Sequence, residues 1–439
     1  MPNTKKLLLH NRAHQIRHEL NLNNRDIEEN FKLEKFQKMS ESAYAFYRGS
    51  NHLYWLDFYN DWRINMFGGS KSTLTWINGD AHIYNYGAYA NHQGEAIFCM
   101  DDFDDAVVAD YQFDLWRMAT SLLLDCRDNG IFGNKPQKKA LFLFANAYLK
   151  EMQAHSEDDP HNEVHLTAKT STGLLKKFLS KVERKKSRLK MLQKWTKVQD
   201  GVRRFDGDNP KLETLSPEEY AKVEAIILDY RKTIVAKFSD EEEHFKVKDV
   251  AKRVKAGTGS LGSDRYYILL EGDTDSEDDD IILDMKEQGK PPLYRHMNQN
   301  EKEEYNRIFP NEGERHARAF SALAEHPDRY LGWISMEGKT FSIKERSPFK
   351  SDFPSEKLSK PKQLYFMADI WGTLLASRHK RASYALNDEA HEMPEAIAAL
   401  TSSKEFEFTD LVCSIGWQYA ERVSKDYDVF LKMLNTSET

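Results

Sequence analysis

The stretch from Leu74 to Asp105 constrains the fold most, because it alternates short apolar runs with closely spaced polar residues. The runs predict one strand followed by a two-stranded hairpin: LTWIN (74–78), YNYGAYA (84–90) and EAIFCMDD (95–102). The turn between the hairpin strands ends in Gly94, which tolerates the positive φ that such turns require. Apolar residues then recur at helical spacing over 115–126. We therefore expect a strand, a loop and a hairpin resting on a helical body.

The loop after the first strand carries a carboxylate and an amide at a spacing that suits phosphoryl transfer. Asp80 and Asn85 are five residues apart, and Asp102 follows seventeen residues after Asn85. In phosphoryl transfer one carboxylate accepts the proton of an attacking hydroxyl, while an amide and a second carboxylate hold Mg²⁺ against the phosphates. Close carboxylates such as those of DDFDD (101–105) repel one another unless a cation lies among them. The alternative is a turn stabilised by its own Asp and Asn side chains.

A second group of residues follows later in the chain, between two predicted strands. GTGSLG supplies Gly257, Gly259 and Gly262, and Lys286 lies on the third strand of this region, IILDMKE. Glycines let backbone amides approach phosphates, and a lysine on a neighbouring strand reaches the α and β phosphates. A dinucleotide-binding loop would need a helix after the glycines, but DRYYILLE predicts a strand. A plain glycine-rich hairpin is the alternative interpretation.

The remaining elements divide the chain into four parts. A helix near 312–325 and the strands YLGWISMEG and KTFSIKERSP complete a small antiparallel sheet, and two helices close the chain at about 361–380 and 408–434. We expect an N-terminal lead-in docked on the catalytic part (1–70), a catalytic part (71–245), a nucleotide-binding part (246–350) and C-terminal helices that complete the catalytic part (351–439).

Charge and composition exclude several classes of protein. A net charge of -7 and a pI near 6.1 give no overall attraction to nucleic acid or anionic lipid. Cys99, Cys126 and Cys413 are too widely spaced for a disulfide framework or a zinc motif. No apolar run reaches the length of a signal peptide core or the ~18 residues of a membrane span. We therefore expect a soluble, cytoplasmic chain without a nucleic-acid or membrane partner, and its oligomeric state stays open.

The segment GDAHIYN, followed by one hairpin and an Asp, resembles the catalytic loop of the aminoglycoside phosphotransferase and choline kinase branch of the kinase-like fold, whose pattern is GDxHxxN. The resemblance implies that Asp80 is the catalytic base, that Asn85 and Asp102 bind the metal, and that His82 structures the loop. Asp114, in FDL, is similar to that family's carboxylate at the start of the next helix.

The same resemblance extends to the second group of residues, with two departures. Protein kinases pair the strand lysine with a glutamate on the following helix, and Glu314 is the best placed of the five glutamates between 301 and 314. Asp284, two residues before Lys286 on the same strand face, stands where protein kinases place a small residue against adenine. The catalytic loop also precedes the glycine-rich loop. The implied fold is α+β, bilobal and protein-kinase-like, circularly permuted so that the helical catalytic lobe comes first and the small antiparallel-sheet nucleotide lobe second.

Over nearly its full length the chain resembles the bacterial family named domain of unknown function 2252. The similarity rests on FYRG (46–49), GDAHIYNYG (79–87), DDFDDA (101–106), FDLWRMATSL (113–122), GTGSLG (257–262), MKE (285–287), YLGW (330–333) and YAERVSKDYDVF (419–430). The family label implies no substrate. Arg48, in FYRG, suits a phosphate or carboxylate partner, or else anchors a turn to the core.

Three hypotheses about function stay open at this point. The first is an ATP- and Mg²⁺-dependent phosphotransferase that acts on an unidentified small-molecule or protein acceptor, with Asp104 and Asp105 supporting the metal site. The second is a metal-dependent hydrolase in which Asp80, His82, Asp102 and Asp105 bind metal and activate water, although it leaves Lys286 without a role. The third is a nucleotide-binding regulator without turnover, or an enzyme that transfers adenylate.

Overall fold

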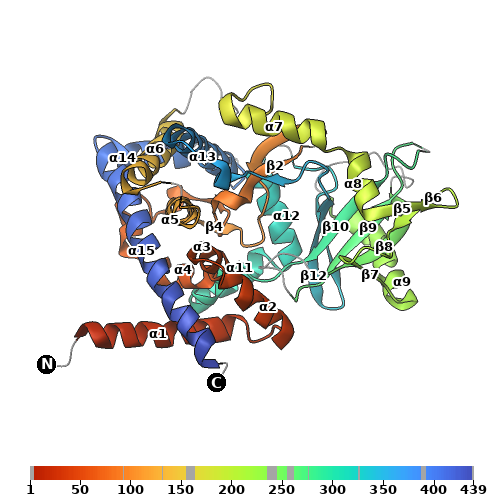
Figure 1. The fold of residues 1–439 in the computed structure, drawn as a ribbon, viewed down its shortest axis with the longest axis horizontal. Coiled ribbons are helices and arrows are strands. Elements are labelled where there is room, and N and C mark those ends of the chain that lie inside the picture. The colour runs from red at the N-terminus through yellow and green to blue at the C-terminus, as the bar shows by residue number, and fades with distance from the viewer. Residues whose placement is uncertain are drawn as a thin grey trace.

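The structure is a computed structural model that describes residues 4–91, 93–130, 132–154, 164–234, 245–254, 262–274, 276–324, 327–386 and 392–437. It is a mixed α+β structure with antiparallel sheets, which confirms the expected fold class at that level. Most helices gather on one side of the molecule and a large sheet forms the other side (Figure 1). We call these two parts the helical body and the sheet body.

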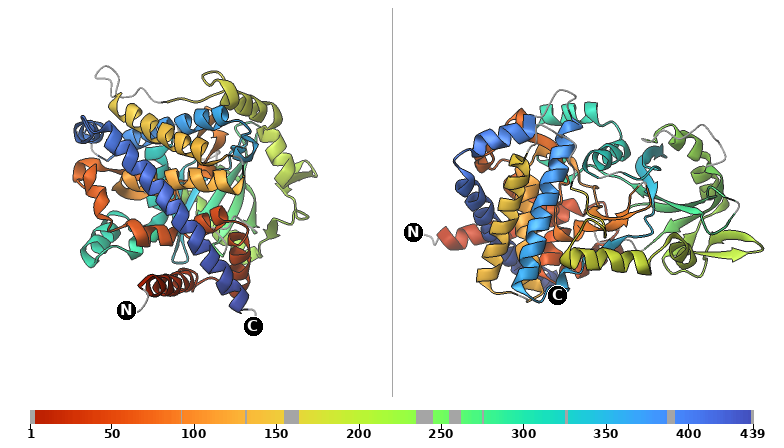
Figure 2. Two further views of the ribbon diagram at one scale, coloured as in Figure 1. Left: turned by 60° about the vertical axis from the view of Figure 1, so that its left-hand side comes forward. Right: turned by 90° about the horizontal axis from the view of Figure 1, so that it is seen from above.

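The helical body is organised around the larger hydrophobic core. Its helices are α1 (Thr4–Asn23), α2 (Glu29–Met39), α3 (Ala43–Gly49), α4 (Asn51–Phe58), α5 (Gln112–Asp128), α6 (Asn134–Gln153), α7 (Gly173–Lys185), α13 (Pro361–Tyr384), α14 (Glu392–Thr401) and α15 (Glu405–Ser437). Helix α5 is buried almost throughout, because α3, α6 and α15 pack around it. The first and last helices, α1 and α15, lie side by side (Figures 1 and 2). No helix in the described part of the chain is long and apolar enough to cross a membrane.

The sheet body contains a six-stranded antiparallel sheet in the order β11-β12-β10-β9-β8-β7. Its strands are β7 (Leu212–Thr214), β8 (Val247–Arg253), β9 (Arg265–Leu270), β10 (Ile281–Glu287), β11 (Gly332–Met336) and β12 (Lys339–Glu345). The strands predicted on either side of GTGSLG and after the 312–325 helix are thereby confirmed. Of the three loop glycines, Gly257 and Gly259 lie outside the described residues.

The two faces of this sheet have different neighbours. On one face, Leu283 and Met285 of β10 pack with Tyr230 beneath α9 (Pro217–Ala225) and α10 (Ile227–Arg231). On the other face, Ile282 packs with Trp195 of α8 (Arg188–Trp195), beside the hairpin of β5 (Thr196–Gln199) and β6 (Val202–Phe205). The next residues on that second face, at alternate positions of β10, are Asp284 and Lys286, because side chains alternate along a strand. On this face of β10, polar side chains therefore follow directly after the apolar residue that α8 covers.

The packing of α8, α9 and α10 differs from the division expected from the sequence. Trp195, Val223 and Tyr230 lie in the smaller cores under the six-stranded sheet, although the sequence groups them with the catalytic part at 71–245. The expected boundary at 245/246 therefore falls inside the sheet body. Amphipathic helices carry no sequence signal for the surface that they cover, so this part of the division could not be read from the pattern.

Helix α12 (Glu312–Leu323) lies between the two bodies, after α11 (Gln299–Ile308). It packs against β11 and β12 on one side and against α13 and β1 on the other. Gly313 permits this approach, because a side chain at that position would collide with the carbonyl of Phe341 in β12. The helix thus fixes the sheet body against the helical body.

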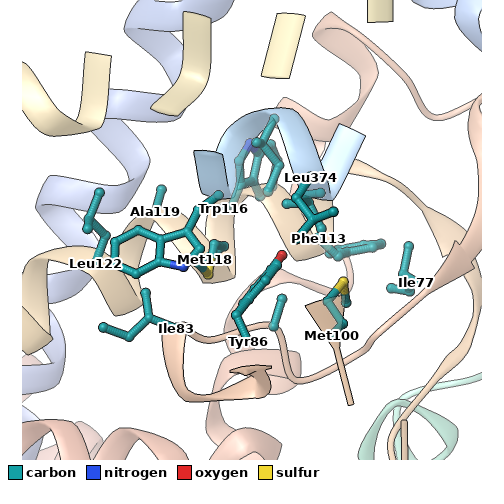
Figure 3. Close-up of a cluster of buried hydrophobic side chains, with 14 of the residues drawn as sticks. Ile77, Ile83, Tyr86, Met100, Phe113, Trp116, Met118, Ala119, Leu122 and Leu374 are labelled. Carbon is teal, nitrogen blue, oxygen red and sulfur yellow. The ribbon is translucent and has the colours of Figure 1, made fainter. Parts of the chain in front are cut away.

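Short strands carry the polar loop on top of the helical core. β1 (Leu74–Ile77) pairs with β4 (Val107–Asp110), and β2 (Tyr86–Ala90) pairs with β3 (Ala96–Met100) and β13 (Ser351–Asp352). Gly94 has a φ of 77°, as the predicted hairpin turn requires. Beneath the loop, Ile83 and Tyr86 pack toward Trp116 of α5 (Figure 3). The predicted strand, loop and hairpin on a helical base are confirmed.

Candidate functional site

A cleft of about 700 Å³ lies between the sheet body and the helical body. Its charged lining comes from both: Arg48, Asp80, His82, Asp101, Asp102 and Asp104 from one, and Arg253, Arg265, Asp284, Lys286, Lys344 and Arg346 from the other. The volume falls within the ~300–1,000 Å³ that is usual for ligand pockets. A ligand in this cleft therefore meets charged groups of both bodies at once.

The turn before Asp80 is fixed from below by Asp114, in the first turn of α5. The Asp114 carboxylate accepts the backbone N–H groups of Asn78 at 2.6 Å and Gly79 at 2.9 Å, and His379 Nε2 lies 3.2 Å from it. Gly79 has a φ of 75°, and a side chain there would collide with the carbonyl of Asp105. Asp114 is 1% exposed and does not line the cleft, so it positions the loop.

Asp80 keeps one carboxylate oxygen on a buried arginine and the other beside the cleft. Arg117 of α5 donates from Nε to Asp80 Oδ1 at 2.7 Å, and its Nη2 also contacts this oxygen. Oδ2 has no hydrogen bond to a described residue and lies 3.9 Å from His82 Nε2. Burial raises the pKa of Asp80 to about 7; Asp105 adds to the shift and Arg117 opposes it. Oδ2 is therefore suited to accept a proton near neutral pH.

His82 holds Arg48 at the cleft. Arg48 Nε donates to His82 Nε2 at 3.2 Å, and the Arg48 guanidinium lies 5.4 Å from the centre of the Tyr84 ring. Burial and the charge of Arg48 lower the pKa of His82, so its ring is neutral and can accept this hydrogen bond. Because Nε2 is engaged in this way, His82 is better explained as a positioning residue than as a metal ligand.

The pairing of β2 with β3 explains the seventeen-residue spacing between Asn85 and Asp102. The antiparallel register places Asn85 opposite Asp101, whose N–H donates to the Asn85 carbonyl at 3.0 Å. Asn78 ties the two ends together, because its Oδ1 accepts from Asn85 Nδ2 at 3.1 Å and its Nδ2 donates to the Asp102 carbonyl. Asn85 and Asp102 are thus neighbours in space.

The free oxygens of Asn85 and Asp102 fit Mg²⁺. Asn85 Oδ1 is buried and has no hydrogen-bond partner among the described residues, which costs free energy unless a ligand contacts it. The Asp102 side chain is exposed to the cleft, and desolvation and the charge of Asp104 raise its pKa. Mg²⁺ commonly takes one or two protein oxygens together with water and substrate phosphates.

The described residues contain no group of three or more His, Cys, Asp or Glu side chains arranged to hold a metal ion.

Lys286 connects the two separated groups of residues. Its Nζ, at the end of β10, contacts Asp104 Oδ2, a residue 182 positions earlier in the sequence. Asp104 Oδ1 accepts from Gln288 Nε2 at 3.1 Å and lies 3.7 Å from His316 Nε2. Burial alone would raise the pKa of Asp104, but the Lys286 charge holds it below its usual value. The acidic segment and the sheet lysine therefore share one cleft.

The expected pair between Lys286 and Glu314 does not form. Glu314 lies 3.8 Å from Arg318 on its own helix, and α12 instead presents His316 to Asp104. Positions 314 and 316 differ by roughly 200° around a helix, so they cannot share the cleft-facing side. The sequence identified the helix correctly and its rotation incorrectly.

Two buried side chains hold the DDFDD segment in place. Arg315 of α12 donates to the carbonyls of Asp104, at 2.7 Å, and Ala106. On the opposite side, Asn51 of α4 donates to Asp105 Oδ2 at 2.7 Å. Burial raises the pKa of Asp105 to about 6, with the Asn51 hydrogen bond opposing the shift. Asp105 is thus anchored by the helical body, while Asp104 is directed toward the sheet.

The sheet wall of the cleft is rich in cations. Arg265 Nε donates to Asp284 Oδ1 at 2.7 Å, so the departure noted at Asp284 is a paired carboxylate rather than a free one. Lys344 lies on the neighbouring strand, and Lys350 Nζ lies 3.0 Å from Asp101 Oδ2 at the cleft mouth. Gly262, the described end of the glycine-rich segment, has a φ of 88° and faces α2. The roles of Gly257 and Gly259 stay predictions.

Sequence reasoning missed Arg117, Asn78 and Arg315. Arg117 left a signal, because it is a charged residue inside the apolar helical pattern of FDLWRMATSL, and such residues are rarely buried without a partner. Arg315 left none, since its role depends on contacts with residues about 200 positions earlier in the chain. Asn78 has nearby partners, Asn85 and Asp102, but an asparagine after a strand does not by itself indicate which groups it bonds.

Comparison with known proteins identifies the family but no activity. No curated protein and no solved structure shows significant similarity to the chain. A family model described as an uncharacterized protein conserved in bacteria matches residues 27–433, which includes every candidate site residue named above. The chain therefore belongs to the bacterial family of domain of unknown function 2252.

Proposed function

We propose that this chain is an ATP- and Mg²⁺-dependent phosphotransferase. The observation that carries the proposal is the contact between Lys286 and Asp104, because it brings the sheet lysine to the acidic segment that follows the GDAHIYN loop. Asp80, Asp102 and Lys286 then line the same cleft. A base, a metal ligand and a phosphate-binding lysine in one cleft are the parts that phosphoryl transfer requires.

A circularly permuted kinase-like fold is part of the same proposal. The lysine strand β10 is followed by the helices α11 and α12 and then by β11 and β12, so a helix follows the lysine as in the kinase-like order of lysine, helix and hinge. Helix α13 comes after β13 and packs on β1, where Thr75 Oγ1 donates to the His379 carbonyl at 2.8 Å. The first long helix after the six-stranded sheet thus lies against the strand that leads into the GDAHIYN loop.

Each residue has a definite task in this reaction. The acceptor hydroxyl oxygen forms a bond to the γ-phosphorus, the bond from that phosphorus to the β–γ bridging oxygen breaks, and ADP leaves with the electron pair. Asp80 Oδ2 takes the hydroxyl proton while Arg117 holds Oδ1. Asn85 and Asp102 would hold Mg²⁺, which would neutralise phosphate charge, and Lys286 would contact the α and β phosphates.

The test combines binding and turnover. Wild-type protein should be stabilised by ATP with Mg²⁺, by about 2.7 kcal/mol at 100 times Kd, and Lys286→Met should lose most of this stabilisation. Asp80→Asn should still bind ATP but lose roughly 10²- to 10⁴-fold of its ADP release. Asp26→Asn, at an exposed position away from the cleft, serves as the matched control. Absence of any ATP-dependent stabilisation of the wild type would refute the proposal.

One observation favours a second candidate, a nucleotide-binding regulator or an adenylate transferase. Asp104 neutralises Lys286, and the helix glutamate expected beside this lysine is turned away. A regulator would bind ATP without forming ADP or AMP in an acceptor screen. An adenylate transferase would release pyrophosphate in place of ADP. Product analysis on the wild type separates these cases.

A further inference from the structure

A second, smaller pocket of about 170 Å³ lies on the helical side of the same charged residues. Arg48, Asp80, Asp102 and Asp104 line both this pocket and the large cleft. The remaining lining comes mainly from the helical body and includes Lys35, Asn51, His52, Asn85 and Asp105. Asp80 therefore has a pocket on each side.

Lys35, on α2, is the residue of this small pocket that most needs a ligand. It is 6% exposed, yet it makes no ion pair or hydrogen bond with any other residue in the described ranges. Burial lowers the pKa of Lys35 and Asp105 opposes this shift, but the Asp105 carboxylate is already bonded to Asn51 at 2.7 Å. A buried cation without a bonded partner is costly, and an anionic ligand group would offset that cost.

Besides Asn85 Oδ1, which is assigned to the metal above, two polar atoms at the small pocket lack partners among the described residues. They are Asn51 Oδ1 and His52 Nε2, on residues that are at most 5% exposed. Burial lowers the pKa of His52 well below its usual value, so its ring is neutral. Buried groups of this kind normally have a partner, and ligand hydroxyl groups would supply one.

We propose that this small pocket binds the acceptor of the reaction, and that the acceptor is a small hydroxylated anion. Its carboxylate or phosphate group pairs with Lys35, and one of its hydroxyl groups lies at Asp80 Oδ2, from which the proton transfer described above follows. The inference rests on the proposed function and adds to it the chemical class of the acceptor. The pocket volume favours a small molecule over a folded protein segment.

The charge of the acceptor follows from the environment of Lys35 and not from the large cleft. Four carboxylates also line this pocket, but Asp80 is paired with Arg117, Asp104 with Lys286, and Asp105 is bonded to Asn51. A cationic acceptor would leave Lys35 unpaired. A neutral polyol would satisfy the unpartnered polar atoms but would also leave Lys35 unpaired. Only an anion meets both requirements of the residues in the small pocket.

The first experiment needs no ATP, so its outcome is separate from that of the proposed function. Thermal shifts of the full chain are measured with glycerol, glycerate and glycerol phosphate, which share hydroxyl groups and differ in charge. Lys35→Met removes the cation at similar length, and Lys32→Met, on the same helix but outside both pockets, is the matched control. We expect glycerate or glycerol phosphate, but not glycerol, to stabilise the wild type and Lys32→Met, and to leave Lys35→Met unshifted.

The two anionic probes distinguish a carboxylate from a phosphate as the preferred group. Equal shifts in Lys35→Met and wild type, or no shift of the wild type by either anion up to ~10 mM, where weak millimolar binding would register, overturn the inference. Turnover adds a second readout: Lys35→Met should raise KM for an anionic acceptor by roughly 10- to 100-fold at unchanged ATP binding, the effect of removing one charged contact. A wild type that transfers phosphate only to neutral or cationic acceptors also overturns it.

Discussion

The contact between Lys286 and Asp104 can be tested by a double-mutant cycle on stability, without knowledge of any substrate. Lys286→Met removes the ammonium group at nearly constant length, and Asp104→Asn removes the carboxylate charge at constant shape. The cycle compares the free energies of unfolding of the wild type, both single variants and the double variant. Its coupling energy isolates the interaction between the two side chains from their separate effects on packing.

The exposure of the two side chains sets the expected magnitude. Lys286 is 19% exposed and Asp104 is 33% exposed, which is intermediate between a surface pair and a buried pair. Surface pairs contribute ~0.2–1 kcal/mol, and breaking a buried pair costs ~3–5 kcal/mol. Allowing for solvent screening, we expect a coupling of about 1–2 kcal/mol at neutral pH.

The assay is urea unfolding with linear extrapolation, measured once at neutral pH and once below the unfolded pKa of Asp104. The pKa of Asp104 is lower in the folded state than in the unfolded state, so its stabilising contribution is present above the unfolded pKa of ~3.9 and is lost as pH falls below it. Lys290→Met, beyond the end of β10 and paired with Glu312, should show no coupling with Asp104→Asn. A Lys286–Asp104 coupling below ~0.3 kcal/mol, with folded single variants, would refute the contact and with it the joining of the two motifs.

Three further predictions concern the supports of the site. Because burial raises the pKa of Asp80 to about 7 and a base must be ionised, turnover should rise with pH through roughly neutral; a profile that is flat there would contradict its role as base. Burial also raises the pKa of Asp125, a residue of α5 that accepts from Ser355 Oγ at 2.9 Å, to about 7. The fold therefore loses stability as pH rises from the unfolded pKa of ~3.9 to about 7, and Asp125→Asn should gain up to about 4 kcal/mol relative to the wild type at pH 8 and nothing at pH 4, as measured by urea unfolding. Arg315→Met should cost about 3–5 kcal/mol, because it removes the buried cation beside Glu312 and leaves the buried carbonyls of Asp104 and Ala106 without this donor, and a loss below ~1 kcal/mol would contradict this account.

The local elements of the site could be predicted because their signals are contained in short stretches of sequence. Alternating apolar runs identified β2 and β3, and the register of their hairpin brings Asn85 beside Asp102. Position 79 requires glycine because its φ is positive and the Asp105 carbonyl approaches it closely. The backbone conformation therefore explains the glycine before Asp80. The proximity of Asn85 and Asp102, which are fewer than about twenty residues apart, could therefore be predicted.

Partners from distant segments could not be predicted, since sequence spacing does not fix the rotation of a helix or the approach of one body to another. Glu314 was expected beside Lys286, but α12 turns His316 to that place and gives Arg315 to the backbone of the acidic segment. Arg117 is the exception, because a charged residue within an apolar stripe indicates that a buried partner is present, here Asp80. The packing of α8 to α10 against the sheet was not predicted for the same reason: the sequence does not say which surface a helix covers.

The order of the motifs along the chain is no obstacle to a single cleft, because the connections between the two bodies are made by side chains and short strands. β13, which follows the six-stranded sheet, pairs with β2, and α13 then packs on β1. Lys286 of β10 and Arg315 of α12 both bond the acidic segment. Joining the two ends of this chain through a linker, and opening it between α10 and β8, would leave all of these contacts intact. In the rearranged chain β8 to β12 come first, and α14, α15, the linker and α1 to α4 lie between α13 and β1. The kinase-like proposal predicts that this rearranged chain keeps its Mg²⁺-dependent ATP binding, and loss of binding in a folded rearranged chain would contradict it.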